Sequence, residues 1–441
     1  MNAAGISTGG GASEEAGAAG AGNEPSPLSS VPGDVPKAAG PARLFFMDNL
    51  RYLMVVLVVL YHSVAAYAVV APHWPLHDTS IFGASIVREL FDVFLMPTLF
   101  FLAGYFALTS LKNRGPRKFL EDKVKRLLMP WALGVFVVLP LALYDQPVKP
   151  VRPFWRYWLS FLGGFQVHLR PTETAVTVST QSVYWFVSLL FAFFLALTLG
   201  HMLTRRRDGE QPRSELCGSP SGPSVLVTLA AFGLLMSAVY FASLLVVPDP
   251  SWCTLSIFLE FQVTRVALYA GCFAFGVYAQ RRGWLADGKP LGSIAAWGAS
   301  SVVLGAAFLL FGRPMFVPAS AAAQSVAYLL AFACLRSFLL VSILVVFLSA
   351  GVRFWNRASG FDRRLAGTSF DIYLVHLFLV VGLQEALLKW SGGPAAVKIA
   401  IVFLTALALS FAVARWILAR HARAFTVVIL ALFTLCLVIR P

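Results

Sequence analysis

The chain has 441 residues, of which 58% are hydrophobic and only 13% are charged, and its mean hydropathy is +0.74. Soluble domains carry about 25% charged residues, so this composition excludes an ordinary soluble protein and is typical of a chain embedded in a bilayer. The formal net charge of +14 does not indicate a partner nucleic acid, because the basic residues gather in short loops between apolar stretches. We predict an all-α fold, a polytopic bundle of transmembrane helices.

Residues 1–42 differ from the rest of the chain. They are rich in Gly, Ala, Ser and Pro and contain no apolar stretch, so we expect a disordered tail. They lack the basic start and apolar centre of a signal peptide. The five cysteines are scattered along the chain without the spacing of a zinc site or a disulfide framework, so we expect no bound metal.

Eleven stretches are long and apolar enough to cross the hydrocarbon, which takes about 20 residues in a helix. In chain order, these spans are 50–71, 86–108, 127–143, 183–203, 224–247, 257–280, 291–311, 322–350, 367–388, 397–418 and 424–439. The third and the last are short, and the eighth is long.

Basic residues alternate from one loop to the next. The loops after the second, fourth, sixth, eighth and tenth spans are rich in Lys and Arg, most densely from Lys112 to Arg126. The other loops hold few, apart from the long 144–182 loop. Because basic loops stay in the cytoplasm, we expect a multi-pass protein of the inner membrane with a cytoplasmic N-terminus and the 144–182 loop outside.

Ionisable residues inside the spans are costly in hydrocarbon and usually face the interior of the bundle. They are Arg51, His62, Asp92, Glu260, Arg265, Arg336, Asp371, His376 and Glu385. For Asp92, Glu260, Arg265, Arg336 and Glu385 we favour a structural role in pairs between helices. Glu260 and Arg265 can pair with each other or with other partners.

The first span carries the most informative pattern. Arg51 and His62 are eleven residues apart, close to three helical turns, so they lie on one face about 16 Å apart along the axis. Asp48 lies three residues before Arg51, where it can orient the guanidinium. This arrangement suits a phosphate-bearing ligand held at the inner mouth while a reactive group reaches a base inside. An interfacial anchor and a packing histidine remain the alternative.

Two outer loops contain further candidates. The 144–182 loop holds Trp155 and Trp158, which can stack on sugar faces but are more often part of an interfacial aromatic belt. The loop after the first span holds His73 and His77. Pro75 lies between these histidines and argues against a helical metal site.

Six segments in chain order resemble the membrane acyltransferase-3 family. They are DNLR and YHS in the first span, PTLFFLAGYFA (Pro97–Ala107), FLEDKVKRLLMPW (Phe119–Trp131), VYWFVSLLF (Val183–Phe191), AGCFAFGVYAQRRGWL (Ala270–Leu285) and TSFDIYLVHLF (Thr368–Phe378). Each is weak alone, but six in order are specific. They look most similar to a glucan-modifying branch typified by the succinyltransferase called glucans biosynthesis protein C.

The resemblance implies a membrane acyltransferase domain of ten core helices over residues 43–420, which leaves 421–441 as an additional, eleventh helix. It implies transfer of an acyl group, of the acetyl or succinyl class, to a hydroxyl of an extracytoplasmic carbohydrate or glycan. The donor is cytoplasmic acyl-CoA, a co-substrate, and no cofactor is bound.

The family's functional residues match positions in this chain. Arg51 and His62 match its Arg and His, and Lys123 and Arg126 match its basic pair, although Lys123 stands where arginine is common and weakens bidentate phosphate contacts. The late signature matches Ser369, Tyr373 and His376.

The matched positions predict separate roles in catalysis and in donor binding. We expect His62 to be the catalytic base, assisted by Arg51 and Asp48 from further along the same helix. We expect Arg51, Lys123 and Arg126 to bind the phosphates of CoA. Tyr373 and His376 can support an oxyanion or position the acceptor, or they can simply make a polar contact between helices. Ser369, Trp155 and Trp158 are candidates for contacting substrate.

Two other classes of protein remain open. A polytopic transporter of a small molecule or a lipid-linked glycan would show inverted repeats with broken helices, and the sequence has none that we detect. A non-catalytic scaffold or sensor would not need Arg51 and His62 on one face.

Overall fold

The computed structural model describes residues 44–69, 74–144, 153–163, 168–169, 181–207, 224–256, 258–312, 325–357 and 359–439. All of them belong to one compact unit, Arg43–Pro441. The expected disordered tail and most of the 144–182 loop lie outside the described residues.

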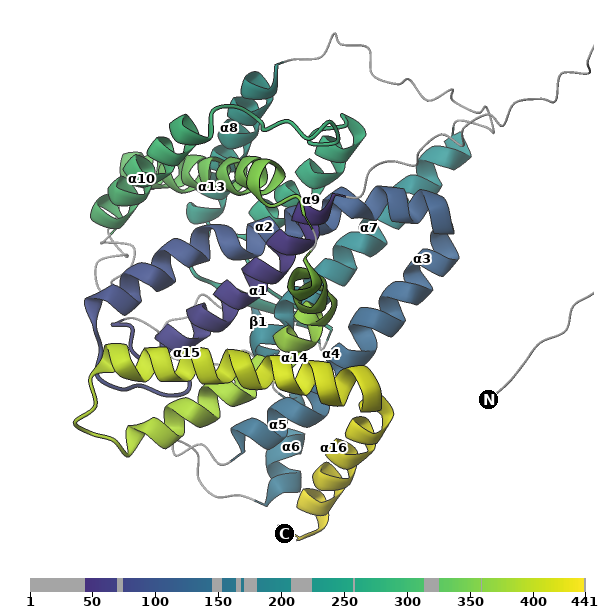
Figure 1. Cartoon of the computed structure of the whole chain (residues 1–441), viewed down its shortest axis with the longest axis vertical. Coiled ribbons are helices and arrows are strands. Elements are labelled where there is room, and N and C mark those ends of the chain that lie inside the picture. Colours follow the sequence, from purple (N-terminus) through teal and green to yellow (C-terminus); the bar gives the residue numbers. More distant parts are fainter. Residues whose placement is uncertain are drawn as a thin grey trace, which may run out of the picture. The chain divides into compact units, whose positions relative to one another are not determined.

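The described elements are helical, apart from three short strands (Figure 1). The helices are α1 (Phe45–Ala65), α2 (Phe82–Arg114), α3 (Pro116–Lys123), η1 (Val124–Leu128), α4 (Met129–Leu133), η2 (Gly134–Val138), α5 (Leu139–Leu143), α6 (Phe154–Gly163), η3 (Ser182–Tyr184), α7 (Trp185–Arg207), α8 (Val225–Leu244), α9 (Val266–Arg281), α10 (Ile294–Phe311), α13 (Val326–Phe354), α14 (Gly360–Leu388), α15 (Ala395–Ala412), η4 (Val413–Leu418) and α16 (Ala419–Ile439).

In the described part of the chain, nine helical segments are long and apolar enough to cross a membrane, which confirms the all-α polytopic bundle. The predicted tenth and eleventh spans form one continuous segment, Ala395–Val438. Its change of direction comes at His421, whose backbone is not helical. The remaining predicted span falls on α9, which has 16 residues.

The predicted span 257–280 is wrong over residues 258–265, which precede α9. Strands β2 (Trp252–Ser256) and β3 (Leu259–Gln262) pair antiparallel there, and β1 (His168–Leu169) pairs with β2. Apolar residues alternate with polar ones in Leu259–Gln262, and only Glu260 and Gln262 of this strand are buried. Alternation with a period of two fits a strand, so the apolar content of this stretch does not indicate a helix.

Helices α2 and α9 approach closely because two glycines meet the facing backbone. A Cβ at Gly104 would lie 2.0 Å from the carbonyl oxygen of Phe273, and a Cβ at Gly276 would lie 2.2 Å from that of Phe101. Small residues at such crossings let helix backbones pack tightly in membranes. Both glycines lie in segments that resemble the acyltransferase-3 family. The role of these two glycines is therefore helix packing.

The third span is built from alternating α-helical and π-helical turns. The π-helical segments η1 and η2 each end shortly before a proline, Pro130 and Pro140 respectively. Proline lacks an N–H and crowds the carbonyl four residues earlier, and a widened turn relieves that conflict.

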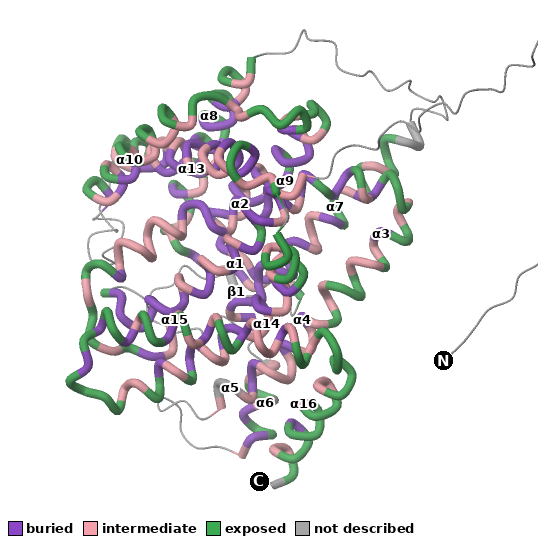
Figure 2. The backbone as a smooth tube through the Cα atoms, in the orientation of Figure 1, coloured by how far each residue is buried: buried purple, intermediate pink, exposed green. Residues whose placement is uncertain are grey.

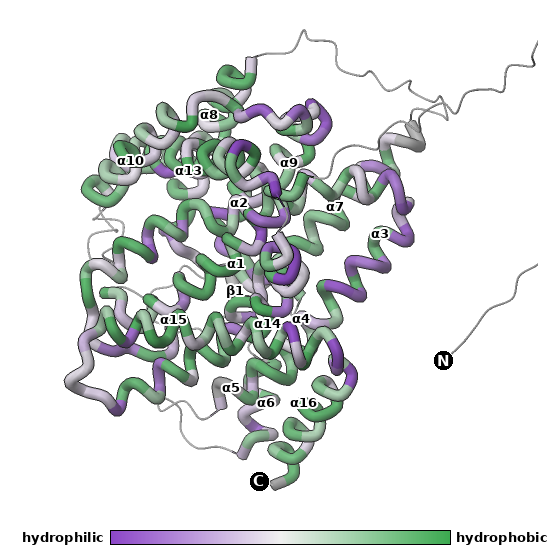
Figure 3. The backbone as a smooth tube through the Cα atoms, viewed as in Figure 1, coloured by the Kyte–Doolittle hydropathy of each residue, from purple (hydrophilic) through white to green (hydrophobic). Residues whose placement is uncertain are grey.

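The outer helices present apolar side chains on the surface. Exposed residues include Leu226 on α8, Val302 and Val303 on α10, and Val427 and Val438 on α16. Figure 2 shows much of α1 buried, whereas α16 is mostly exposed. Figure 3 shows that α8 and α10 are mainly hydrophobic, while α3 is hydrophilic. Lipid contact explains this exposure, which would be unfavourable in water.

Four ionisable side chains form a buried network between α2, α9 and α13. Arg265 contacts Asp92 at 2.5 Å and Asp249 at 2.8 Å, and Arg336 contacts Asp92 at 3.1 Å. Burial acts to raise the pKa of Asp249, but the guanidinium groups of Arg265 and Arg336 outweigh it and lower the pKa to about 2. The expected interhelical pairing is confirmed for Asp92, Arg265 and Arg336.

Glu260 does not pair with Arg265. One of its carboxylate oxygens accepts a hydrogen bond from the backbone N–H of Gln181, at 2.8 Å. Glu385 is exposed.

Candidate active site

Two histidines meet between α1 and α14, which pack side by side. His62 lies in the last turn of α1, and His376 lies on α14. Nε2 of His376 is 3.1 Å from Nδ1 of His62, and the ring centroids are 5.1 Å apart. His376 is fully buried, whereas His62 is 9% exposed. The structure therefore joins two candidates that the sequence offered separately.

The neighbouring acceptors determine where the protons of this pair lie. Nδ1 of His376 is 2.6 Å from the carbonyl oxygen of Tyr373, so Nδ1 carries the ring proton and Nε2 of the neutral ring accepts. Nδ1 of His62 faces this Nε2 and also the carbonyl oxygen of Val58 at 3.0 Å. Nδ1 of His62 therefore donates, which leaves the lone pair of the neutral imidazole on Nε2. A base of this geometry accepts a proton at Nε2.

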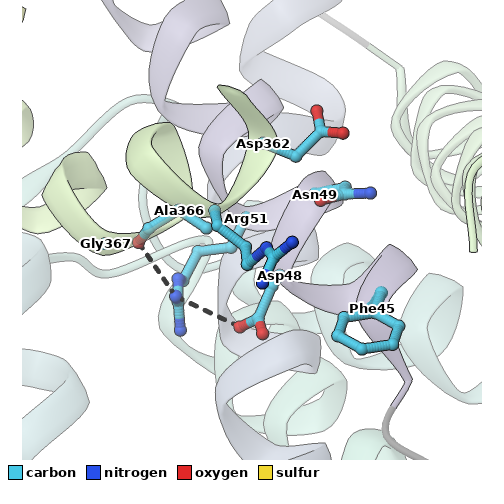
Figure 4. A pocket seen from close by; sticks show the side chains of 8 residues that line it. Phe45, Asp48, Asn49, Arg51, Asp362, Ala366 and Gly367 are labelled. Atoms are coloured by element: carbon cyan, nitrogen blue, oxygen red, sulfur yellow. Dashed lines mark hydrogen bonds and ion pairs between the residues drawn. The ribbon is translucent and has the colours of Figure 1, made fainter. Parts of the chain in front are cut away.

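Arg51 lies at the other end of α1, beside a shallow pocket (Figure 4). Its Nη2 is 3.2 Å from Asp48 Oδ1 and donates to the carbonyl oxygen of Ala366 on α14, also at 3.2 Å. Asp48 thus orients the guanidinium, as the spacing predicts. The pocket has a volume of about 270 Å³, slightly below the roughly 300–1,000 Å³ of sites for whole small molecules. It suits one group of a larger ligand.

The same end of α1 is tied to the turn between α13 and α14. The amide nitrogen of Asn49 donates to the carbonyl oxygens of Trp355 and Arg357, at 2.8 and 3.0 Å. The hydroxyl of Tyr52 donates to Asp362 at 2.6 Å. These bonds hold Arg51 at a fixed position relative to α14.

A basic cluster lies close to Arg51. The positive charges of Arg126, Arg114 and Arg51 all act on Lys123. The ammonium of Lys123 also lies over the rings of Phe194 and Phe119, at 4.2 and 5.2 Å from the centroids. The structure thus gathers the cations that the sequence placed on α1, on the end of α2 and on the start of the third span.

The comparisons decide the family. A family model described as an acyltransferase domain, that of the acyltransferase-3 family, matches residues 44–439. The chain belongs to this family. It is a membrane acyltransferase that transfers groups other than aminoacyl groups. The matched region includes α16. Searches among curated proteins and among solved structures give no match.

Two residues of the late signature of this acyltransferase donate hydrogen bonds to backbone carbonyl oxygens. The hydroxyl of Tyr373 donates to the backbone carbonyl oxygen of Val183, and the hydroxyl of Ser369 donates to the carbonyl oxygen of Ala366 at 3.0 Å. The hydroxyl of Tyr184 donates in turn to the carbonyl oxygen of Leu374 on α14, at 2.7 Å. In this conformation Tyr373 positions the helix that carries His376, whereas the bond of Ser369 lies within α14 itself. The predicted contacts of both residues with substrate stay predictions.

The two tryptophans of the 144–182 loop lie on α6, in different surroundings. The indole N–H of Trp158 donates to the carbonyl oxygen of Phe136 at 3.0 Å, and its ring packs edge-on against Phe433 of α16. Trp155 is 40% exposed, with the guanidinium of Arg156 5.0 Å from its ring centroid. Trp155 is the one with surface to offer a ligand, and its predicted sugar contact stays a prediction.

Sequence reasoning missed two side chains that touch His62. Trp74 stacks on the imidazole, with centroids 5.4 Å apart and planes at 22°. Gln384 donates to the carbonyl oxygens of His62 and Ser63, at 3.1 Å each. The available signal for Gln384 was its position two turns after His376, on the same face of the same helix.

Proposed function

We propose that this acyltransferase moves an acyl group, of the acetyl or succinyl class, from cytoplasmic acyl-CoA to a hydroxyl of an extracytoplasmic carbohydrate or glycan. The observation that carries the proposal is the His62–His376 pair, in which Nδ1 of His62 is held by two acceptors and Nε2 is left to act as a base. His62 of this pair lies on the same helix as Arg51, which is close to the basic cluster.

In the proposed reaction, the acceptor hydroxyl oxygen attacks the thioester carbonyl carbon while His62 Nε2 takes the hydroxyl proton. The new C–O bond forms, the C–S bond breaks, and the proton on His62 passes to the departing thiolate, so the products are the ester and CoA. His62 is positively charged between these two transfers. His376 Nε2 keeps accepting from Nδ1–H and so stabilises that charge.

The donor site of this proposal is the inner end of α1. Arg51, Lys123 and Arg126 bind the phosphates of CoA, since guanidinium and ammonium groups form strong charge-assisted hydrogen bonds with phosphate. Arg51 and His62 are about 16 Å apart along the helix axis, and the thin pantetheine arm spans that distance. Asp48 and Asp362 also line the pocket at Arg51, and their carboxylates disfavour a phosphate there. The phosphates therefore bind on the side of Arg51 where the basic cluster lies.

In the proposed orientation the protein spans the inner membrane, and the helix ends rich in Lys and Arg lie on the cytoplasmic side. The arrangement in the structure supports it. α1 begins on the side of the bundle towards which α2 runs (Figure 1), and the charge of Arg51 acts on Lys123. Arg51 and the cluster from Lys112 to Arg126 therefore belong to one side of the bundle. His62 lies towards the other side, and the acceptor reaches it from there.

Two measurements test the proposal. Purified protein in liposomes, supplied with isotope-labelled acetyl- or succinyl-CoA and a mixture of soluble glycans, should give esters detectable by mass spectrometry. Mass spectrometry of surface glycans and lipids from cells with and without the chain should show the same added mass. An acylated lipid or protein in place of a glycan would contradict the acceptor class, and no labelled product from any CoA thioester would contradict the donor.

A further inference from the structure

Helix α1 ends one turn after His62, and this leaves its last carbonyl groups without partners inside the helix. The carbonyl oxygens of Val64 and Ala65 accept from the following loop. Those of His62 and Ser63 accept from one side chain of another helix, the amide of Gln384 on α14, at 3.1 Å each. Gln384 therefore closes the end of α1 at the residue proposed as the base.

Trp74 connects the same amide to the imidazole ring. Its indole N–H donates to Gln384 Oε1 at 2.8 Å, and its ring stacks on His62. Because indole N–H can only donate, Oε1 of Gln384 faces Trp74 and Nε2 faces the two carbonyls. All the polar groups of this buried amide are thus paired, and His62 is held both by its backbone and by its ring.

The loop that carries Trp74 is itself anchored. The N–H of Asp78 donates to the carbonyl oxygen of Ala66, and that of Ile81 donates to the carbonyl oxygen of Tyr67, both at 2.9 Å. The ammonium of Lys398 on α15, which is fully buried, donates to Asp78 at 2.7 Å. The segment that follows Trp74 is therefore anchored to the end of α1 and to α15.

We propose that Gln384 and Trp74 are positioning residues for the acyl transfer, and that they act through His62 by holding its Nε2 towards the reacting hydroxyl. This inference rests on the proposed role of His62 as the base. The imidazole can turn about its side-chain bonds, and its contacts with Trp74, with Tyr61 at 5.1 Å between centroids and with His376 limit that rotation. Displacement of a catalytic group by about 1 Å can slow a reaction by roughly 100-fold.

The test uses Gln384→Leu, Trp74→Phe and Trp74→Ala, assayed for acyl transfer in liposomes. Gln384→Leu keeps the volume but removes the bonds to both carbonyls and to the indole, so kcat should fall by about 10- to 100-fold. Trp74→Phe keeps an aromatic ring but loses the N–H bond, so its kcat should fall less than that of Trp74→Ala. The KM for acyl-CoA should stay unchanged, because the donor phosphates bind at the other end of α1.

The matched control is Gln280→Leu, which replaces a half-buried glutamine of α9 outside the site. A structural role alone would lower the yield of folded protein and leave the kcat of the folded fraction unchanged. If Gln384→Leu and both Trp74 variants turn over like Gln280→Leu, the inference is wrong. If Gln384→Leu does not fold, the difference between Trp74→Phe and Trp74→Ala decides the question.

His62→Ala in the same assay separates this inference from the proposed function. If His62→Ala is active, or the unaltered protein transfers no acyl group, the proposed function fails. If His62→Ala is inactive but the Gln384 and Trp74 variants are normal, only the positioning role fails.

Discussion

Replacement of His376 by leucine should slow acyl transfer without weakening donor binding. The substitution removes one of the two acceptors of His62 Nδ1–H and leaves the carbonyl oxygen of Val58 as the other. A buried hydrogen bond left unmade costs about 1–3 kcal/mol, and each 1.4 kcal/mol in the barrier is roughly tenfold in rate. Since Val58 still fixes the tautomer, we expect kcat to fall by about 10- to 100-fold rather than by the larger factor that follows loss of a base.

The assay is steady-state transfer from labelled acyl-CoA by purified protein in liposomes. His376→Gln restores an acceptor oxygen near the position of Nε2, so it should recover most of the activity that His376→Leu loses. The KM for acyl-CoA should not change in either variant. The matched control is His421→Leu, which replaces an exposed histidine on α16. A His376→Leu variant with the kcat of the control would refute the pair, and a loss confined to KM would place His376 in donor binding instead.

Three further predictions address the donor site, the segment that carries Trp74 and Asp78, and the orientation. Arg126→Gln should weaken CoA binding, measured by titration calorimetry, more than Lys112→Gln does, because Arg126 acts on Lys123 in the cluster near Arg51; equal losses would point to a lipid-binding role. Asp78→Asn should lower the free energy of unfolding by about 3 kcal/mol, because it leaves the fully buried ammonium of Lys398 unpaired. Lys398→Met should lower it less, and the reverse order would contradict this account of the loop. Burial acts to raise the pKa of Asp78, but bonds from Lys398 and Thr79 lower it overall, so the loss should also appear as the pH falls below about 4 and not at higher pH. Cys217 in the 204–223 loop should resist an impermeant thiol reagent in intact cells, and its labelling would reverse the orientation.

The sequence predicted the bundle because its signals are local. A span needs only an apolar stretch, and the shared face of Arg51 and His62 needs only the helical repeat. The contact from Asp48 to Arg51 is of the same kind, and it is present. The segment 258–265 failed because apolar content alone does not separate a buried strand from a short helix.

The contacts across helices could not be predicted in this way. His376 is 314 residues from His62 in the chain, and the family-like signature that marks it gives no partner. Gln384 matches no motif, and its importance appears only once α14 lies against the open end of α1. Glu260 accepts a hydrogen bond from the backbone N–H of Gln181, a contact that no pattern of charges reveals.

The central claim is that His62 is the base for acyl transfer, and it is tested most directly by one comparison in liposomes. His62→Ala and the control His421→Ala should be purified, reconstituted and given equal amounts of labelled acyl-CoA and acceptor. Because a general base contributes about 10²- to 10⁴-fold, His62→Ala should lose transfer by at least that lower factor while it binds CoA normally, and His421→Ala should be unaffected. A His62→Ala variant with near-normal turnover would reduce His62 to a packing residue and contradict the mechanism.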